Sequence, residues 1–244
     1  MTHCKNCNTV LNGKFCSDCG QPANIKRIDG HYISHEVQHL LHFEKGIFFT
    51  VRELLLRPGH TVREFITENR VRLIKPIPFL IFSSLIYTLI SHYFHTEEDY
   101  SHALGKMYGK SSIGPIFHWV QTHYGYANIM MGGFIALWIS IFFKKRNYNI
   151  FEITILLCFI MGMGMLLLST GALLEGIFHS PTAFLIMLIM TLIYVCWGIG
   201  QFFDQKKIVN YIKAVLAYGL GFLTFEIAIV IVGLTYDIIK FLLK

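Results

Sequence analysis

The chain has 244 residues, of which 54% are hydrophobic, 15% aromatic and only 15% charged, and its formal net charge is +6. Because soluble domains are about one quarter charged, this composition excludes a disordered chain, a coiled coil and most single soluble domains. The first 75 residues hold 11 of the 21 Lys and Arg residues, and long uncharged runs fill the remainder. We therefore expect an integral membrane protein.

The first 24 residues contain two CxxC pairs, Cys4 with Cys7 and, eight residues later, Cys16 with Cys19. Each pair places two thiolates on one side of a tight turn, and two such turns complete a tetrahedral sulfur site. The spacing predicts a zinc ribbon with one structural Zn²⁺ per chain. A disulfide or a redox CxxC is the alternative, but a cytoplasmic segment is kept reduced. We expect the ribbon to bind a protein partner, and not nucleic acid, because Phe15 is its only aromatic side chain.

Residues 25–75 form a basic, amphipathic juxtamembrane segment. Within it His31, His35, His39 and His42 share one helical face, and residues 35–39 match the HExxH pattern. In that pattern two histidines one turn apart bind zinc and the glutamate, here Glu36, acts as a general base. His31 or His42 would have to supply the third ligand from the same helix. The alternatives are a metal site without catalysis and the polar face of a helix that lies at the membrane surface.

A short repeat follows, with Thr50 and Glu53 in its first copy and Thr61 and Glu64 in its second. Each copy has the spacing of a capping box, which predicts two short helices that start at the threonines. Six basic residues line this region, and we expect them to contact anionic lipid head groups. They are Arg52, Arg57, Arg63, Arg70, Arg72 and Lys75. Packing of these short helices on the protein's own transmembrane bundle is the alternative.

This arrangement resembles a known family. The two CxxC pairs, the segment ELLLRPGHT at residues 53–61, Arg70, and Lys75-Pro76 at the start of a hydrophobic region are the shared features. They resemble a bacterial family of uncharacterised multipass membrane proteins that carry an N-terminal zinc ribbon. The resemblance covers residues 4 to about 80. It implies the architecture of the chain but no activity.

Five apolar stretches are long enough to cross a bilayer, which takes roughly 20 helical residues. They lie near residues 76–95, 126–143, 153–174, 182–203 and 214–236. Helices are required, because backbone groups that face lipid must be paired within their own segment. The expected fold is therefore an all-α integral membrane protein, with about five transmembrane helices in residues 76–244 preceded by the ribbon and the amphipathic helices.

The distribution of basic residues predicts the orientation of the chain. Before the first span there are 11 Lys and Arg; the four connections between spans hold 2, 3, 0 and 3, and the C-terminal end holds 2. Larger counts alternate with smaller ones, as the positive-inside rule requires for a cytoplasmic N-terminus, and the first residues do not resemble a secretory signal. We expect a multipass protein of the bacterial inner membrane with a periplasmic C-terminus.

Glu226 lies near the middle of the fifth expected span. A carboxyl group at that depth has to face the bundle interior, water or a partner. It serves either as a hydrogen-bonding strut between helices or as part of an ion or substrate path. Tyr194, Tyr218 and Thr224 are its candidate partners.

The function that we expect is a nonenzymatic membrane scaffold, sensor or gated assembly that forms a homo-oligomer. Two alternatives stay open. One is a transporter or channel with Glu226 in the path. The other is a membrane-surface metallohydrolase that uses His35, Glu36 and His39.

Overall fold

The structure is a computed structural model that describes residues 3–11, 13–24, 46–94 and 111–243. Within these ranges the regular structure is helical, apart from two isolated antiparallel bridges in the N-terminal segment. Five helices are long and apolar enough to cross a membrane. They are α4 (Pro76–Phe94), α7 (Tyr124–Phe142), α8 (Ile150–Phe178), α9 (Pro181–Asp204) and α10 (Ile208–Leu242). The expected fold class is confirmed, and each expected span overlaps one of these helices.

The central helix of the bundle is α8, in which every residue from Ile155 to Gly164 is buried. Helices α4 and α9 pack along it, and α7 pairs with α10. Glycines permit the close approaches. A methyl group on Gly162 would lie 2.8 Å from the ring of Phe79 in α4, and one on Gly221 of α10 would lie 2.5 Å from Ile135 in α7. Such contacts between small residues and large neighbours are typical of membrane helices.

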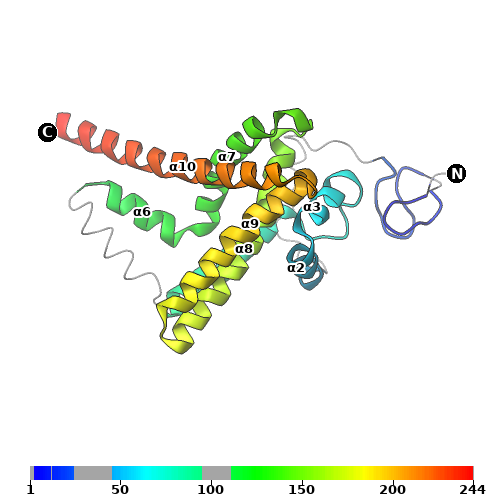
Figure 1. The fold of residues 1–244 in the computed structure, drawn as a ribbon, viewed down its shortest axis with the longest axis horizontal. Coiled ribbons are helices and arrows are strands. Elements are labelled where there is room, and N and C mark those ends of the chain that lie inside the picture. Colours follow the sequence, from blue (N-terminus) through cyan, green and yellow to red (C-terminus); the bar gives the residue numbers. More distant parts are fainter. Residues whose placement is uncertain (1–2, 12, 25–45, 95–110, 244) are drawn as a thin grey trace.

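The bundle has two parts that diverge from one end (Figure 1). The α8–α9 hairpin forms one part, and α10 with α7 and the short helix α6 (Ile113–Thr122) forms the other. Helix α6 packs on the far half of α10, where Ile113 and Phe117 form a small apolar cluster with Phe225 and Ile229. The N-terminal segment lies at the end where the two parts meet, and we call this end of the molecule the ribbon end.

Two further short helices, α2 (Ile47–Leu56) and α3 (Pro58–Thr67), also lie at the ribbon end (Figure 1). The predicted capping boxes at Thr50 and Thr61 are wrong, because both threonines lie inside helices that begin three residues earlier. The Thr50 hydroxyl accepts a hydrogen bond from the amide of Ile74 at 3.0 Å. The Thr61 hydroxyl donates to the Glu53 carbonyl at 3.2 Å. Proline at the first position of α3 sets the start of that helix instead.

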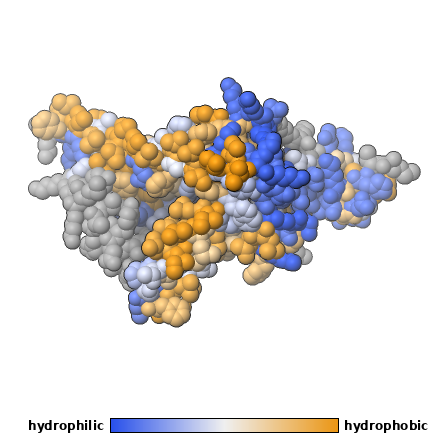
Figure 2. All heavy atoms as spheres, in the orientation of Figure 1, coloured by the Kyte–Doolittle hydropathy of each residue, from blue (hydrophilic) through white to orange (hydrophobic). Residues whose placement is uncertain are grey.

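Hydrophilic residues cover the ribbon end, and apolar residues cover the helices that extend from it (Figure 2). The short connection after α7 contains the 3₁₀ helix η1 (Lys144–Arg146), and the connection after α9 contains Lys206 and Lys207. Both connections lie at the ribbon end. The basic residues of the described connections between spans therefore share the end that carries the N-terminal cysteines.

Candidate metal centre

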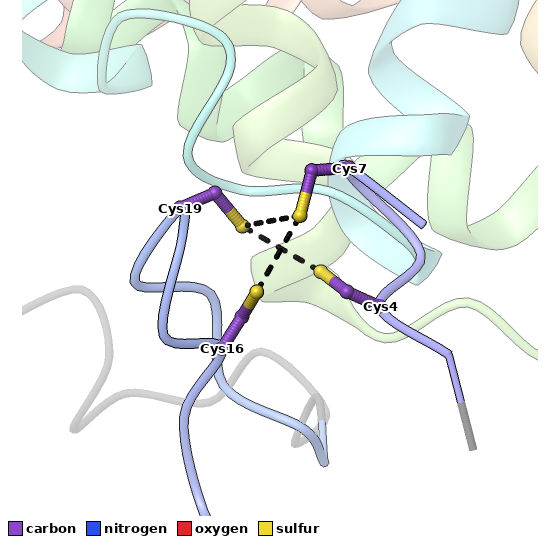
Figure 3. Close-up of side chains that lie close together, drawn as sticks. All are labelled: Cys4, Cys7, Cys16 and Cys19. Atoms are coloured by element: carbon purple, nitrogen blue, oxygen red, sulfur yellow. Dashed lines mark hydrogen bonds between the residues drawn. The ribbon is translucent and has the colours of Figure 1, made fainter. Parts of the chain in front are cut away.

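The four N-terminal cysteines converge on one point (Figure 3). Their sulfur atoms all lie within 4.8 Å of one another. The Sγ–Sγ distances are 3.5 Å for Cys4 and Cys19, 3.4 Å for Cys7 and Cys16, and 3.5 Å for Cys7 and Cys19. Four sulfurs at the usual zinc distance of about 2.3 Å from a central ion would be about 3.8 Å apart. The arrangement therefore fits a tetrahedral metal ion.

The two CxxC turns have the same backbone hydrogen bonds, offset by 12 residues. The amides of Asn8 and Gly20 donate to the carbonyls of Cys4 and Cys16, at 2.9 and 3.0 Å. The amides of Cys4 and Cys16 donate to the backbone carbonyls of Thr9 and Gln21, both at 2.8 Å. Bridges close each turn, between positions 3 and 10 and between positions 15 and 22. The first cysteine of each turn is buried, and the second is more exposed.

Each turn ends on a residue with a left-handed backbone. This residue follows the second cysteine, and it is Asn8 in the first turn, with φ of 64°, and Gly20 in the second, with φ of 72°. Glycine adopts this conformation freely, and asparagine is the non-glycine residue that tolerates it best. The residue types at these two positions therefore fit the chain reversal that brings the thiols together.

Local hydrogen bonds favour thiolates at the first turn. Amide hydrogen bonds from Cys7 and Asn6 lower the pKa of the Cys4 thiol. Hydrogen bonding to the hydroxyl and the amide of Thr9 lowers the pKa of Cys7 to about 6. At Cys19 a hydrogen bond from the amide of Gln21 also lowers the pKa. Burial and the neighbouring thiols of Cys7 and Cys4 outweigh it, and the pKa of Cys19 is raised to about 11. A cation bound among the four sulfurs would favour the thiolate form of all four and balance their charge.

The ribbon is attached to the loop that follows α3. The side-chain amide of Gln21 donates to the backbone carbonyl of Glu68 at 2.6 Å. The side-chain amide of Asn69 donates to the side-chain oxygen of Asn6 at 2.5 Å. The side-chain oxygen of Asn69 in turn accepts from the backbone amides of Val71 and Arg72, both at 3.2 Å. Asn69 therefore organises its own loop and holds the ribbon at the same time.

Helix α3 is attached, at its other side, to the end of α9. The Gly59 amide donates a buried hydrogen bond to the side chain of Gln201 at 2.8 Å. The Arg63 guanidinium donates from Nε to the carbonyl of Phe202 at 3.0 Å and from Nη2 to that of Gln201 at 2.9 Å. In α2 the Leu54 carbonyl accepts from the hydroxyl of Tyr194 at 2.9 Å. The two short helices are therefore part of the bundle's packed structure.

The six basic residues predicted to contact lipid have different environments. Arg57 pairs with Glu53 at 2.5 Å and with Glu64 at 3.6 Å, and Arg63 binds α9. Arg70 donates to the Ile66 carbonyl at 3.0 Å, and Arg72 lies 4.4 Å above the ring of Phe49. Lys75 is partly buried and Arg52 is exposed. Packing on the protein's own bundle, the alternative from the sequence, accounts for α3.

A small polar pocket lies between α2 and α3. Its volume is about 30 Å³, and Glu53, Thr61, Glu64 and Asn69 contribute to its lining. A space of this size holds about one or two water molecules. It is therefore too small for a substrate.

Two other sites were predicted from the sequence, the HExxH segment and Glu226. His35, Glu36, His39 and His42 lie outside the described residues. Glu226 is partly buried on α10. Of its three candidate partners, Tyr194 donates to Leu54, and Thr224 accepts from the indole of Trp138 at 3.2 Å. No hydrogen bond or ion pair joins Glu226 to another residue within the described ranges.

Several structural residues were not recognised from the sequence, because their partners are distant. Gln201 and Tyr194 meet the short helices from 142 and 140 positions away. Asp237, on α10, accepts from the amide and the hydroxyl of Ser112 at the start of α6. The capping box at the start of α8, formed by Asn149 and Glu152, is local, and sequence analysis could have found it.

Comparison with protein families finds a match for part of the chain. Residues 44–88 match a family described as "Protein of unknown function (DUF3667)". This stretch comprises α2, α3 and most of α4, and it supports the resemblance to an uncharacterised family. The match does not include the cysteine cluster. Neither a curated protein nor a solved structure matches the chain.

Proposed function

We propose that this protein is a nonenzymatic scaffold of the bacterial inner membrane, in which a zinc-loaded ribbon is fixed to the cytoplasmic end of the bundle and binds a protein partner. One observation carries the proposal. The ribbon is held through Asn6 and Gln21 by the loop at residues 68–72, and the helix before that loop is fixed to α9. A continuous chain of contacts therefore joins the cysteine cluster to the membrane-spanning helices.

The donor set supports zinc in a structural role. Tetrahedral sites with four cysteine sulfurs suit Zn²⁺ or iron, and in a zinc site of this kind no coordination position stays open for water or substrate. A ribbon of about 20 residues buries little apolar surface, so metal binding would supply its folding energy. The chemistry therefore favours a module that holds its shape over one that performs a reaction.

The charge distribution supports the orientation. The described connections after α7 and α9 carry Lys144, Lys145, Arg146, Lys206 and Lys207, all at the ribbon end. Cytoplasmic loops are enriched in Lys and Arg. The cysteine cluster is then in a reducing compartment, where its thiols stay available for metal.

Metal analysis of the full chain in detergent tests the proposal. We expect one zinc per chain, its loss in Cys16→Ser, and its retention in the matched control Cys196→Ala, which alters a cysteine of α9. His39→Ala should also retain it. Absence of metal from freshly purified protein would contradict the proposal. A second zinc that is lost in His39→Ala would instead favour the metallohydrolase.

Hydrogen exchange tests whether the ribbon and the bundle are coupled. Removal of the metal should accelerate amide exchange at residues 68–72, where the ribbon is attached, and should leave the buried part of α8 protected. Unchanged exchange at residues 68–72 would show that the metal-bound ribbon does not stabilise this loop, and the scaffold proposal would fail.

A further inference from the structure

Helix α2 has an exposed apolar face that the bundle does not cover. Phe48 is 88% exposed, Leu56 61% and Leu55 47%. Together with Arg52 they lie within about 100° of one another around the helix axis. On the opposite side Thr50 and Leu54 are fully buried. One side of α2 therefore packs on the protein, and the other presents three large apolar side chains with one arginine among them.

The contact with α9 places the end of α2 beside the apolar part of that helix. The Leu54 carbonyl accepts a hydrogen bond from Tyr194, which is ten residues before the end of α9 at Asp204. At 1.5 Å per residue, this is about 15 Å along the axis from the ribbon end of α9. Side chains lean toward the N-terminus of their helix, which for α9 is the direction of the far side of the membrane. With the ribbon end of α9 at the membrane surface, the end of α2 lies about this far below it.

The contacts of α3 give the same depth independently. The ring of Phe65 packs edge-on against Phe159 of α8, with centroids 5.1 Å apart. Phe159 lies nine residues, about 13 Å, from the start of α8. Pro58, at the start of α3, packs against Gly198 of α9. A methyl group on Gly198 would lie 3.3 Å from the proline ring and 2.6 Å from Ile160 of α8. Phe65 and Pro58 of α3 are thus level with the ribbon-end halves of α8 and α9, as Leu54 of α2 is. Gly59 and Arg63 lie at the last residues of α9, and Thr50 lies beside Ile74, just before α4.

The charges that the short helices bring to this depth are compensated within the protein. Arg57 pairs with Glu53 and Glu64, and Arg63 binds the terminal carbonyls of α9. Such pairing is what a charged group inside a membrane requires. Arg52 is exposed on the apolar face, and its long side chain can extend its guanidinium to the phosphate level while its methylenes stay among apolar groups.

We propose that α2 and α3 form a re-entrant helix pair set into the leaflet at the ribbon end. In this arrangement Phe48, Leu55 and Leu56 contact acyl chains, and Arg52 binds the phosphate of an anionic lipid. The lipid-facing surface of the bundle continues onto α2, because apolar side chains over α2 adjoin those of the α8–α9 hairpin (Figure 2). This surface is independent of the metal.

Fluorescence quenching in lipid nanodiscs tests the depth of α2. The variant is Phe48→Trp, and the matched control is Phe15→Trp, which replaces an exposed aromatic residue of the ribbon. The signal of the three native tryptophans is subtracted. Acyl-brominated lipid should quench the tryptophan at position 48 and acrylamide should not, and the reverse should hold at position 15. Quenching at position 48 by acrylamide alone, or by neither agent, would overturn the proposal.

The anionic partner is tested in nanodiscs that contain phosphatidylglycerol and phosphatidylcholine at equal mole fraction. Either the phosphatidylglycerol or the phosphatidylcholine is brominated, in separate samples. We expect the anionic lipid to be enriched near position 48 by up to about fivefold, the ratio that one surface charge supplies. Arg52→Gln should remove this preference and leave quenching by the neutral lipid unchanged. Equal quenching by the two lipids in the Phe48→Trp protein that keeps Arg52 would overturn the assignment of Arg52.

Discussion

The amide of Gly59 donates a buried hydrogen bond to the side-chain oxygen of Gln201, 142 positions further along the chain. The two backbones are so close that a methyl group on Gly59 would lie 2.2 Å from the amide nitrogen of Phe202 and 2.6 Å from the carbonyl carbon of Gln201. Only glycine fits at this contact. The first turn of α3 is therefore fixed to the last two turns of α9.

We expect Gly59→Ala to destabilise the protein by about 1–3 kcal/mol, the usual cost of an overpacked core site. The added methyl group meets backbone atoms, which cannot rotate away. Unfolding in mixed micelles of mild detergent and SDS measures the change. The matched control is Gly219→Ala, because Gly219 is helical and exposed and has no atom within 4 Å of the added methyl group. That control should be neutral or stabilising by up to about 1 kcal/mol. Equal effects of the two substitutions would contradict the contact.

Two of the helices that end at the ribbon end receive a cation from another element. Arg63 donates to the last carbonyls of α9, and Lys213 of α10 donates to the Phe142 carbonyl at the end of α7, at 3.1 Å. The end of a helix has unpaired carbonyls and a partial negative charge. A basic side chain compensates both.

Arg63→Ala should lower the free energy of unfolding by about 1.5–3 kcal/mol, the range for hydrogen bonds that involve a charged group. Arg63→Lys should recover part of this loss, because the ammonium group keeps the charge but lacks the planar set of donors. Arg52→Ala is the control, since Arg52 is an exposed arginine on α2, and in detergent it should change stability by less than about 0.5 kcal/mol. The same unfolding assay measures all three. A loss with Arg52→Ala as large as with Arg63→Ala would argue against a specific role for the α9 contact.

The fold class could be predicted from the sequence because hydropathy and length act locally. The spans start and end near prolines and charged connections, and the expected bounds fall close to those of α4 and α9. The cysteine cluster was equally accessible, because both CxxC turns lie within a few residues of each other and their spacing determines where the thiols point. In both cases the signal and the structure share the same stretch of chain.

The contacts of α2 and α3 could not be predicted, because they depend on partners more than 100 residues away. Thr50 and Thr61 had the spacing of capping boxes, but their hydroxyl groups bind the Ile74 amide and the Glu53 carbonyl, and a proline starts α3 instead. Arg63 was predicted to face lipid head groups, and in the structure its guanidinium binds α9. A sequence pattern reports residue type and spacing, and the partner is determined by tertiary packing.

The left-handed residues of the two CxxC turns lead to a prediction about metal affinity. Gly20→Ala should weaken zinc binding about 5- to 30-fold, because an alanine at φ of 72° costs about 1–2 kcal/mol in backbone strain. Asn8→Gly, at the equivalent position, relaxes the backbone and should leave the affinity close to that of the unmodified chain. Competition with a chromophoric chelator measures both. Equal affinities for the Gly20→Ala and Asn8→Gly variants would show that the turn geometry does not control the site.

Asp237 joins the start of α6 to the far half of α10. Its carboxylate accepts from the hydroxyls of Ser111 and Ser112, at 2.7 and 2.6 Å, and from the amide of Ser112. Those groups lie at the start of α6, so an acidic residue of α10 caps a helix 125 positions earlier in the chain. The positive end of the helix dipole of α6 adds to this attraction.

We expect Asp237→Ala to loosen α6 while the ribbon end stays intact. Amide exchange in α6 should be roughly fivefold faster, the factor that the loss of one helix cap supplies, and exchange in α2 and α3 should not change. Asp237→Asn should have a smaller effect, because its amide oxygen still accepts from Ser112. The control is Thr235→Ala, whose hydroxyl bonds only to carbonyls of its own helix among the described residues. If Thr235→Ala accelerated exchange in α6 as much as Asp237→Ala does, fraying of α10 would explain the result and the cap would have no separate role.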